Sequence, residues 1–424
     1  MIKNLHNFYK ILKLPYKSRK RIEEMQLWKL QRLLLHANRN VELYEDKFRD
    51  VDLNQVNSLL DLKEIPFALP SDFRGVEVQR TVAKNVPQNE LITQKTSGTT
   101  SEPMSFLNSR EEDKMRQLKS LRFQWQHGWK PWWKGVHIWR DVSQKKYSIF
   151  QRLINNRRSF VSINLPIEKQ VEKIMEIRPD MIFGLTSSLE VVADWMLANN
   201  KSYKTRLVYS GGEFKSLNVH RKFEKAFGHP GIERYGSVEC GLIAFTCPHC
   251  GNYYVDEDGF ILEVLDDQNN PVKNGQVGRA VITALDQYTM PVIRYDIGDR
   301  IALLDEPVEC KIHYKHFKRV DGRETDKIVL ENGRVIVFQH VIQLINCTDG
   351  LNKIQLRQNR GGDILIKYIK DKKVDQYEFE AELSKKLRLD KARVTFEDCR
   401  YIANEPNGKY RLVKSELGAP YEYT

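Results

Sequence analysis

Alternation of short apolar stretches with helix-like stretches, between about residues 160 and 300, limits the fold of this chain most strongly. Apolar residues at 181–184 precede a helix-like stretch at 187–198, and a second apolar stretch at 207–209 runs into the turn Ser210-Gly211-Gly212-Glu213. Strand, helix, strand and glycine-rich turn in this order are typical of a layered α/β domain, whose ligands bind at the carboxyl ends of the strands. The sequence therefore predicts an α/β fold with a ligand near this turn, although an ordinary strand-to-helix turn reads the same way.

The length and charge of the chain set wider bounds. Its 424 residues exceed what one hydrophobic core usually supports, so two or more domains are expected. A net charge of +12 favours anionic partners such as nucleotides, coenzyme A, lipid surfaces or nucleic acid. The basic residues are spread along the chain and not gathered in one tail, so nucleic acid is the weakest of these interpretations and is not expected as a partner.

The distribution of apolar residues predicts a cytoplasmic protein. No run approaches the 18 or more apolar residues of a membrane span, and the first seven residues lack the uninterrupted apolar segment of a signal peptide. In the cytoplasm the six cysteines are expected to be reduced, so that clustered ones are candidates for metal binding.

The first forty residues are expected to be largely helical. Leu27, Leu30, Leu34 and Ala37 recur with helical spacing, which predicts a helix packed on a core. Residues 2–12 mix apolar residues with lysines and could instead lie on an anionic membrane surface. Peripheral membrane association therefore stays an alternative for this segment, although covering a core is the commoner role.

A loop rich in hydroxyl groups follows Lys95. Its hydroxyls, its backbone N–H groups and the adjacent ammonium could surround a polyphosphate, with a glycine that lets the backbone approach closely. The residues predicted to bind phosphate are Thr96, Ser97, Gly98, Thr99 and Thr100. The spacing is not that of a P-loop, so a Walker-type NTPase is not indicated. An ordinary Ser/Thr-rich turn is the alternative.

Four more polar clusters follow in a fixed order. Tyr235-Gly236-Ser237-Val238-Glu239 combines an aromatic ring, a glycine and a carboxylate, which could stack on a base and hold Mg²⁺. Asp299 follows a glycine and could bind ribose hydroxyls, and Gly322-Arg323 and Gly408-Lys409 complete the series. Each cluster alone is typical of an ordinary polar turn, and only their order and separation point to one site.

This order resembles the adenylate-forming enzyme superfamily. The Ser/Thr/Gly loop, Gly-Gly-Glu, Tyr-Gly-x-x-Glu, Arg-Tyr-x-x-Gly-Asp, Gly-Arg and terminal Gly-Lys are similar to the phenylacetate–coenzyme A ligase-like branch, which includes the CapK proteins of capsular polysaccharide biosynthesis. The resemblance covers essentially the whole chain, because residues 26–44 are similar to the opening helix of that branch. It implies that a carboxylic acid is coupled to ATP with release of pyrophosphate, and that the acyl group then passes to a thiol or an amine.

The resemblance also implies roles for particular residues. Thr96, together with the hydroxyls that follow it, would hold the β- and γ-phosphates as pyrophosphate leaves. Glu239 would ligate Mg²⁺, and Lys409 would bridge the attacking carboxylate and the α-phosphate. These three are the expected catalytic residues.

The remaining residues would bind the nucleoside. Those expected along the adenine and the ribose are Gly211, Gly212, Glu213, Tyr235, Gly236, Asp299 and Arg323. Tyr235 would stack on the base, and Asp299 with Arg323 would fix the ribose. Because the reaction is an in-line displacement at phosphorus, positioning and electrostatics are expected to supply most of its acceleration.

The domains expected from the resemblance are a large adenylation domain at 1–322 and a small mobile α+β lid at 323–424. In the lid, 336–345 reads as a helix, and residues near 354–356 and 364–366 alternate as the two strands of a hairpin. Two departures from the family pattern stand out. Val238 replaces the usual hydroxyl residue, and Thr325 replaces the usual acidic hinge residue, although a hinge needs no particular side chain.

Paired cysteines predict a structural metal site. Cys247 and Cys250 have Cys-x-x-Cys spacing, and Cys310 and His313 supply a second pair about sixty residues later. Two such pairs satisfy a tetrahedral Zn²⁺ site that would hold two loops together. Cys240 and His249 are the rival ligands.

Two other functions stay open at this point. A chain with these motifs could be a nucleotide-binding scaffold of a polysaccharide pathway that has lost turnover, and the tryptophans between 107 and 160 could form a platform for single-stranded nucleic acid. The sequence does not identify the acid, for which Trp139, Phe183 and Tyr209 are pocket candidates, nor does it choose between coenzyme A and an amine as acceptor. It gives no indication of the oligomeric state.

Overall fold

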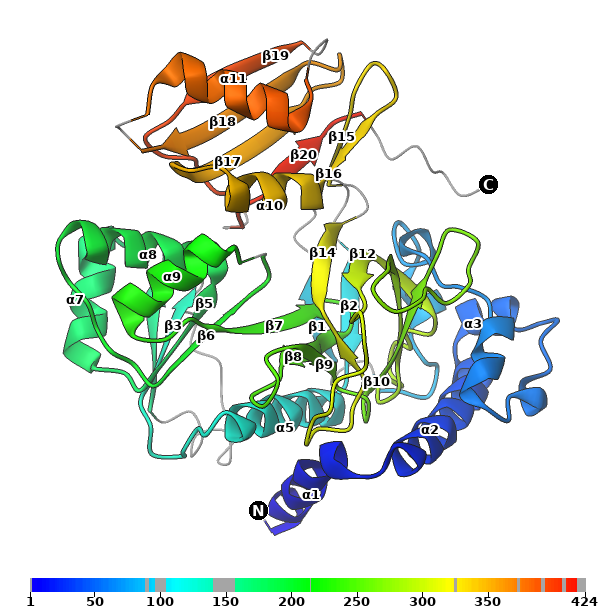
Figure 1. Ribbon diagram of the computed structural model, residues 1–424. Coiled ribbons are helices and arrows are strands. Elements are labelled where there is room, and N and C mark those ends of the chain that lie inside the picture. The colour runs from blue at the N-terminus through cyan, green and yellow to red at the C-terminus, as the bar shows by residue number, and fades with distance from the viewer. Residues whose placement is uncertain are drawn as a thin grey trace. The chain divides into compact units, whose positions relative to one another are not determined.

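The computed structural model describes most of the chain. The described residues are 2–87, 91–95, 104–139, 157–213, 215–323, 326–371, 374–389, 393–405 and 409–417, with side chains from residue 8 onward. Strands and helices alternate through the middle of the chain, and a smaller sheet with two helices follows near its C-terminus (Figure 1). The fold is α/β with a small α+β C-terminal part, as predicted.

The described chain divides into two compact units. Unit 1 contains residues 1–131 and 233–320, and unit 2 contains residues 132–232 and 321–424. The chain leaves unit 1 after Val320, two residues before the expected boundary at 322. The expected adenylation domain is thus spread over both units, and its function as one domain stays a prediction.

Helices open unit 1 and pack on its sheets. Its helices, including short 3₁₀ turns, are α1 (Ile2–Lys13), η1 (Leu14–Tyr16), α2 (Arg19–Asn40), α3 (Glu42–Lys47), η2 (Leu53–Gln55), η3 (Leu59–Glu64), η4 (Pro70–Asp72), α4 (Val78–Thr81) and α5 (Arg110–Gln126). The predicted packing helix is α2, in which Leu30, Leu34 and Ala37 are buried. Ser109 and Glu112 begin α5 with reciprocal hydrogen bonds between each side chain and the other residue's backbone N–H.

The strands of unit 1 are largely antiparallel. They are β1 (Ile92–Lys95), β2 (Ser105–Asn108), β7 (Ile232–Ser237), β8 (Gly241–Thr246), β9 (Tyr253–Val255), β10 (Phe260–Leu265), β11 (Val277–Ala284), β12 (Tyr295–Ala302), β13 (His316–Phe317) and β14 (Arg319–Arg323). Here β10, β11 and β12 form one meander, and β7, β8, β9 and β13 pair in that order. The chain passes between the units within β7 and again within β14. One apolar core joins α2 to these sheets, from Leu30 to Ile282.

The first part of unit 2 is a parallel α/β layer. Its elements are β3 (Gly135–Trp139), β4 (Arg158–Ser162), α7 (Ile167–Ile177), β5 (Met181–Leu185), α8 (Thr186–Ala198), β6 (Leu207–Gly211) and α9 (Leu217–Phe227). The strand order is β6-β5-β3-β4, all parallel, and α7, α8 and α9 cover one face (Figure 1). The predicted strand–helix–strand segment is confirmed, and Gly211 ends β6.

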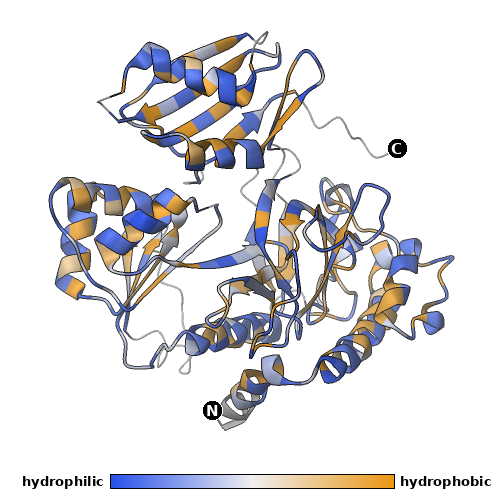
Figure 2. Cartoon of the chain, viewed as in Figure 1, coloured by the Kyte–Doolittle hydropathy of each residue, from blue (hydrophilic) through white to orange (hydrophobic). Residues whose placement is uncertain are grey.

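The C-terminal part of unit 2 has its own apolar core. Its elements are β15 (Lys327–Val329), β16 (Val335–Val337), α10 (Phe338–Cys347), β17 (Leu351–Gln358), β18 (Ile364–Lys370), α11 (Gln376–Leu387), β19 (Val394–Asp398) and β20 (Val413–Ser415). The predicted hairpin is confirmed, because Leu356 pairs with Ile366 across β17 and β18. Buried and less buried residues alternate along β18, and these strands contain both apolar and polar residues (Figure 2). The helix expected at 336–345 begins two residues later, since Ile336 pairs with Ile328 in a strand.

Candidate active site

The predicted phosphate loop falls in the part of the chain that is not described. This applies to Thr96, Ser97, Gly98, Thr99 and Thr100. The residues on either side are described, and Lys95 pairs with Ser105 across the β1–β2 hairpin. The two ends of the segment therefore lie side by side in unit 1, and its role stays a prediction.

Two predicted nucleoside residues meet in unit 1. The hydroxyl of Tyr235 on β7 donates a hydrogen bond to Asp299 Oδ2 on β12, at 2.8 Å. Gly236 next to it is closely packed, because a Cβ there would lie 2.3 Å from the carbonyl oxygen of Gly241. The structure thus brings together residues 64 positions apart in the sequence. This hydrogen bond fixes the orientation of the buried Tyr235 ring, as stacking on an adenine base would require.

The expected Mg²⁺ ligand, Glu239, is buried with 8% of its surface exposed. Its carbonyl oxygen accepts hydrogen bonds from Gln287 Nε2 at 3.2 Å and from Arg116 Nη2 at 3.4 Å. Among the described residues we find no hydrogen bond or ion pair to its carboxylate. A buried carboxylate without a protein partner is costly, and a hard cation such as Mg²⁺ takes oxygen ligands. The residue fits the expected metal on this ground.

The Gly-Gly-Glu turn in unit 2 meets the terminal motif. The Glu213 carboxylate accepts hydrogen bonds from Ser187 N at 2.6 Å, Ser187 Oγ at 2.9 Å and the backbone N of Tyr410. It therefore caps the first turn of α8, where helix N–H groups lack partners of their own. Burial raises the pKa of the Glu213 carboxyl above its ordinary value, although the hydrogen bonds from Ser187 and Tyr410 oppose this shift.

Lys409 lies against the same turn. A Cβ placed on Gly212 would be 3.8 Å from Lys409 Cε and 4.0 Å from Lys409 Nζ. Gly212 has φ +78°, a conformation that favours glycine, so the turn itself depends on this residue. Two motifs almost 200 residues apart in the sequence are thus adjacent in unit 2, and Gly211 leads into them as the last residue of β6.

Asp326 connects the expected hinge region to the terminal motif. Its side chain accepts a hydrogen bond from the backbone N of Arg323 at 3.3 Å and forms an ion pair with Arg411 at 2.7 Å. Asp326 was expected only as a neighbour of the hinge, and its link to the terminal motif could not be read from the sequence. Arg323 and Asp299, the expected ribose pair, belong to different units.

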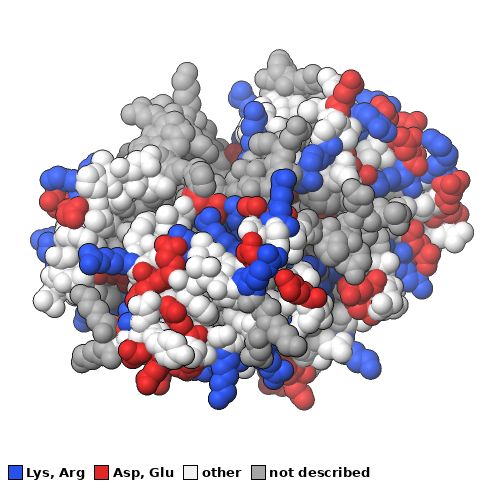
Figure 3. All heavy atoms as spheres, turned by 90° about the horizontal axis from the view of Figure 1, so that it is seen from above, with Lys and Arg blue, Asp and Glu red and all other residues white. Residues whose placement is uncertain are grey.

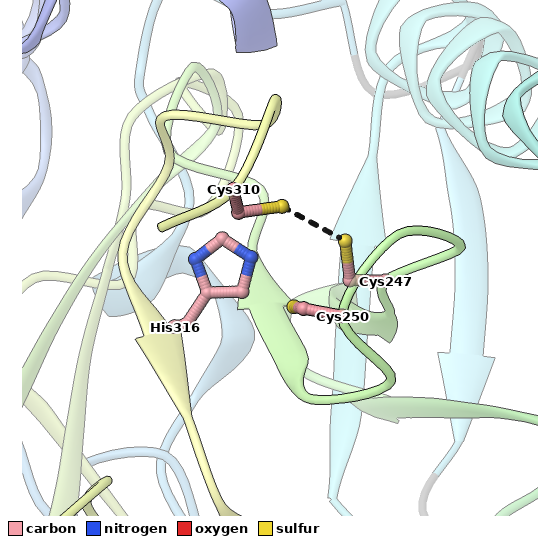
Figure 4. A group of neighbouring side chains, drawn as sticks. All are labelled: Cys247, Cys250, Cys310 and His316. Atoms are coloured by element: carbon pink, nitrogen blue, oxygen red, sulfur yellow. Dashed lines mark hydrogen bonds between the residues drawn. The ribbon is translucent and has the colours of Figure 1, made fainter. Parts of the chain in front are cut away.

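A group of potential metal ligands lies at the β8–β9 turn. The ligand atoms of Cys247, Cys250, Cys310 and His316 all lie within 4.8 Å of one another, and three sulfurs and one imidazole face a common centre (Figure 4). The sulfurs of Cys247 and Cys310 are 3.5 Å apart. Tetrahedral Zn²⁺ with Zn–S bonds of about 2.3 Å separates two sulfurs by about 3.8 Å, so this spacing suits the metal.

The predicted fourth ligand, His313, is not in this group. Its Nδ1 lies 2.8 Å from the carbonyl oxygen of Lys17, whereas His316 on β13 faces the cysteines (Figure 4). Spacing alone favoured His313, but pairing of β13 with β9 turns His316 toward the turn that carries Cys247. The rival residues Cys240 and His249 do not belong to the group either.

Local contacts fit a bound metal. His316 Nε2 is buried and has no hydrogen-bond partner in the described part of the chain. Backbone N–H groups of His249 and Ile312 donate to the sulfurs of Cys247 and Cys310, each at 3.4 Å, and such bonds favour the thiolate form that binds zinc.

The described aromatic residues of the segment differ in burial. Phe123 and Trp129 are buried, whereas Trp125, Trp132 and Trp139 are exposed. Basic and acidic side chains are interspersed over the described part of the face shown in Figure 3.

Among the described residues, no helix combines the length and the apolar character that a membrane span requires.

The comparisons agree with the motif order. No family model matches the chain. Phenylacetate-coenzyme A ligase of Pseudomonas putida is 23% identical over 369 residues, which cover 81% of this chain and 80% of the relative. Protein CapK of Staphylococcus aureus is 22% identical over 413 residues, which cover 93% and 89%.

The fold agrees as well. The crystal structure of 2-hydroxyisobutyryl-CoA ligase in the postadenylation state, in complex with R3-HIB-AMP, has a TM-score of 0.80 and 18% identity. The match covers 95% of this chain and 92% of that chain. The curated relatives and the shared fold thus agree with the predicted resemblance to the adenylate-forming superfamily. These curated relatives are phenylacetate-coenzyme A ligases, which agrees with the predicted enzyme class, an AMP-forming acid–thiol or acid–amine ligase.

Proposed function

We propose that this chain activates a carboxylic acid with ATP as an acyl-adenylate, releases pyrophosphate and transfers the acyl group to coenzyme A. The observation that carries the proposal is the position of Lys409 against Gly212, with Glu213 bonded to the backbone of Tyr410. This arrangement supports a lysine that meets the nucleotide at the end of β6. An amine acceptor is the alternative to coenzyme A, and the names of the curated ligases favour the thiol.

Each cluster would contribute one part of the reaction. Tyr235 would stack on the adenine, with Asp299 on the ribose and Arg323 beside it. Mg²⁺ held by Glu239 would neutralise phosphate charge, and the Lys409 ammonium would stabilise the negative charge that develops at the α-phosphate. The hydroxyl-rich loop 96–100 would hold the β- and γ-phosphates, and Val238 would leave one phosphate contact fewer than usual.

ATP–pyrophosphate exchange with a panel of carboxylic acids tests the proposal. We expect exchange with at least one acid, and Lys409→Ala should reduce its rate by roughly 100-fold or more, as loss of a transition-state charge contact does. Lys385→Ala is the matched control, because this exposed lysine lies on α11 in the same C-terminal part and should leave the rate unchanged.

A scaffold without turnover is the rival function. It predicts ATP binding without exchange for every acid, and that result would overturn the ligase proposal.

The similarity to Protein CapK supports a setting in surface polysaccharide biosynthesis. We propose the cytoplasm as the location, where ATP and coenzyme A are available. Loss of surface polysaccharide on deletion of the gene would support this setting, and an unchanged polysaccharide would contradict it.

We also propose that Cys247, Cys250, Cys310 and His316 hold a structural Zn²⁺, which would join the β8–β9 turn to the segment before β13. Elemental analysis of the purified protein should give about one zinc per chain. His316→Ala should lose this metal, whereas His313→Ala should keep it. Equal metal content in both variants would contradict the ligand set.

A further inference from the structure

A cavity of about 220 Å³ lies in unit 1 beside the Glu239 motif. One side is formed by α5, which contributes Met115 and Arg116, and another by Cys240 and Gly241, the two residues that directly follow Glu239. Water occupies roughly 30 Å³ per molecule, so the cavity has room for a small organic group. A group bound there would lie next to the predicted Mg²⁺ ligand.

Arg116 lines the cavity, and only one of its two terminal nitrogens, Nη2, donates hydrogen bonds to described residues. Its Nη2 donates to Gln287 Oε1 at 2.9 Å and to the carbonyl oxygen of Glu239 at 3.4 Å. Its Nη1 is buried and has no hydrogen-bond partner in the described part of the chain. The guanidinium also lies against Gly241, where a Cβ would be 3.4 Å from Arg116 Nε and 3.5 Å from Cζ. This would be ordinary van der Waals contact, and Gly241 is favoured here by its φ of +82°, a conformation that other residues rarely adopt.

The charges around the cavity are otherwise engaged. Lys119 forms an ion pair with Asp286 at 2.7 Å, and Glu112 accepts hydrogen bonds from the backbone N–H groups of Tyr288 and Thr289. Asp113 accepts a hydrogen bond from Gln117 at 2.6 Å. The buried Nη1 donor of Arg116 thus differs from these neighbours, which already have protein partners.

A buried cationic donor without an acceptor is destabilising, so a ligand that supplies an oxygen is favoured over one that supplies a methyl group. The carboxylates of Glu112 and Asp113 lie near enough to Arg116 to interact with its charge, and they disfavour a second anionic group on the ligand. An uncharged oxygen, from a hydroxyl or a carbonyl group, satisfies both conditions.

We propose that this cavity receives the acyl part of the substrate, and that Arg116 selects a carboxylic acid whose acyl chain carries a hydroxyl or carbonyl oxygen over an apolar acid of the same shape. This inference rests on the proposed ligase function. It assigns Arg116 a role in specificity, because the residue lines the cavity and would contact the acyl group and not the reacting phosphate.

Matched acid pairs test the inference. Each pair consists of a short hydroxy or keto acid and the acid in which a methyl or methylene group replaces the oxygen function. Exchange rates and calorimetric binding in the presence of AMP are measured for the native chain, Arg116→Met and Arg116→Lys. The control Lys114→Met removes an exposed cation from the same helix, where Lys114 contacts Glu111 at 3.3 Å on the surface.

The native chain is expected to prefer the oxygenated acid of a pair by roughly 10- to 100-fold, in line with the value of a hydrogen bond to a charged group. Arg116→Met should lose most of this preference without losing the apolar acid, Arg116→Lys should retain part of it, and Lys114→Met should retain all of it. A preference for apolar acids, or the same preference in Arg116→Met, would overturn the inference.

The binding measurement separates this inference from the proposed function. If no acid supports exchange but the oxygenated acid still binds through Arg116, the ligase proposal fails and the pocket assignment stands. If exchange occurs and the selectivity is independent of Arg116, the ligase stands and the pocket assignment fails.

Discussion

Two groups of buried carboxylates in unit 1 contrast sharply. The acidic turn, Asp256-Glu257-Asp258, is at most 2% exposed, and each of its carboxylates has a cationic partner. Arg122 on α5 binds Asp256 and Asp258, the latter at 2.8 Å, and Arg19 on α2 binds Glu257. Glu239 is almost as deeply buried and has no such partner among the described residues.

The contrast separates a structural role from a binding role. In the acidic turn the cations come from α2 and α5, so the ion pairs fix these helices to the turn between β9 and β10, two strands of different sheets. A paired charge needs no ligand. Within the described residues, Arg116 Nη1 has no hydrogen-bond partner and the Glu239 carboxylate has no hydrogen bond or ion pair, which favours binding of an oxygen acceptor and of a cation. Burial alone does not distinguish the two roles, but the partners do.

The largest effect on the free energy of unfolding is expected from substitution of Arg122. Arg122→Met leaves Asp256 and Asp258 without their guanidinium, and removing one member of a buried ion pair typically costs 3–5 kcal/mol. The free energy of unfolding, measured with urea, should fall by about this amount.

Lys318→Ala provides the control for that measurement. Lys318 contacts Asp305 at 2.6 Å, but both side chains are largely exposed, so little or no change in the free energy of unfolding is expected. Equal effects of the two substitutions would show that the acidic turn does not fix the helices.

Glu239 should show the opposite pattern. Glu239→Gln removes a charge that has no ion pair within the described part of the chain, so the free energy of unfolding should stay within about 0.5 kcal/mol or rise. ATP–pyrophosphate exchange should fall by roughly 10²- to 10³-fold, because the proposed Mg²⁺ ligand is lost. A strongly destabilised variant would place Glu239 with the acidic turn as a structural residue.

The smallest effect is expected from acid. Burial alone would raise the pKa of Asp258, but Arg122, Lys119 and Lys29 outweigh it and hold the pKa of Asp258 below its ordinary value. A lowered pKa means that the stabilisation is present above the unfolded value of about 3.9 and is lost as the pH falls below it toward the folded value. The free energy of unfolding should therefore decline below about pH 4.

Asp258→Asn should make the free energy of unfolding less dependent on pH below about pH 4. An unchanged dependence would contradict the role given to Asp258.

Glu213 contributes to stability with the opposite dependence on pH, because its pKa is raised. Its contribution to stability is present below its unfolded value of about 4.3 and is lost as the pH rises through the folded value.

Local patterns predicted the elements well. Apolar spacing placed the helix with Leu30 and Leu34 and the hairpin of β17 and β18, because both patterns depend on neighbours in sequence. The motif order also predicted the superfamily. Sequence could not choose His316 over His313, since this depends on the pairing of β13 with β9.

The role of Arg116 carried no motif signal. Its position depends on Gly241 and Gln287, which lie 125 and more residues away and become neighbours only in the folded chain. The acidic turn gave a weak signal, three successive acids after an apolar strand. Its basic partners on α5, Lys119 and Arg122, are three residues apart, and this spacing could have suggested buried ion pairs.

Unit 1 is assembled from two stretches of chain, 1–131 and 233–320, with the whole α/β layer of unit 2 inserted between them. During synthesis at the ribosome, α2 emerges long before β10, β11 and β12, against which its apolar face packs. At typical elongation rates this interval lasts on the order of 10 s. Fragments that end before residue 320 will expose this face and should aggregate, so expression of the intact chain is a condition for obtaining unit 1 folded.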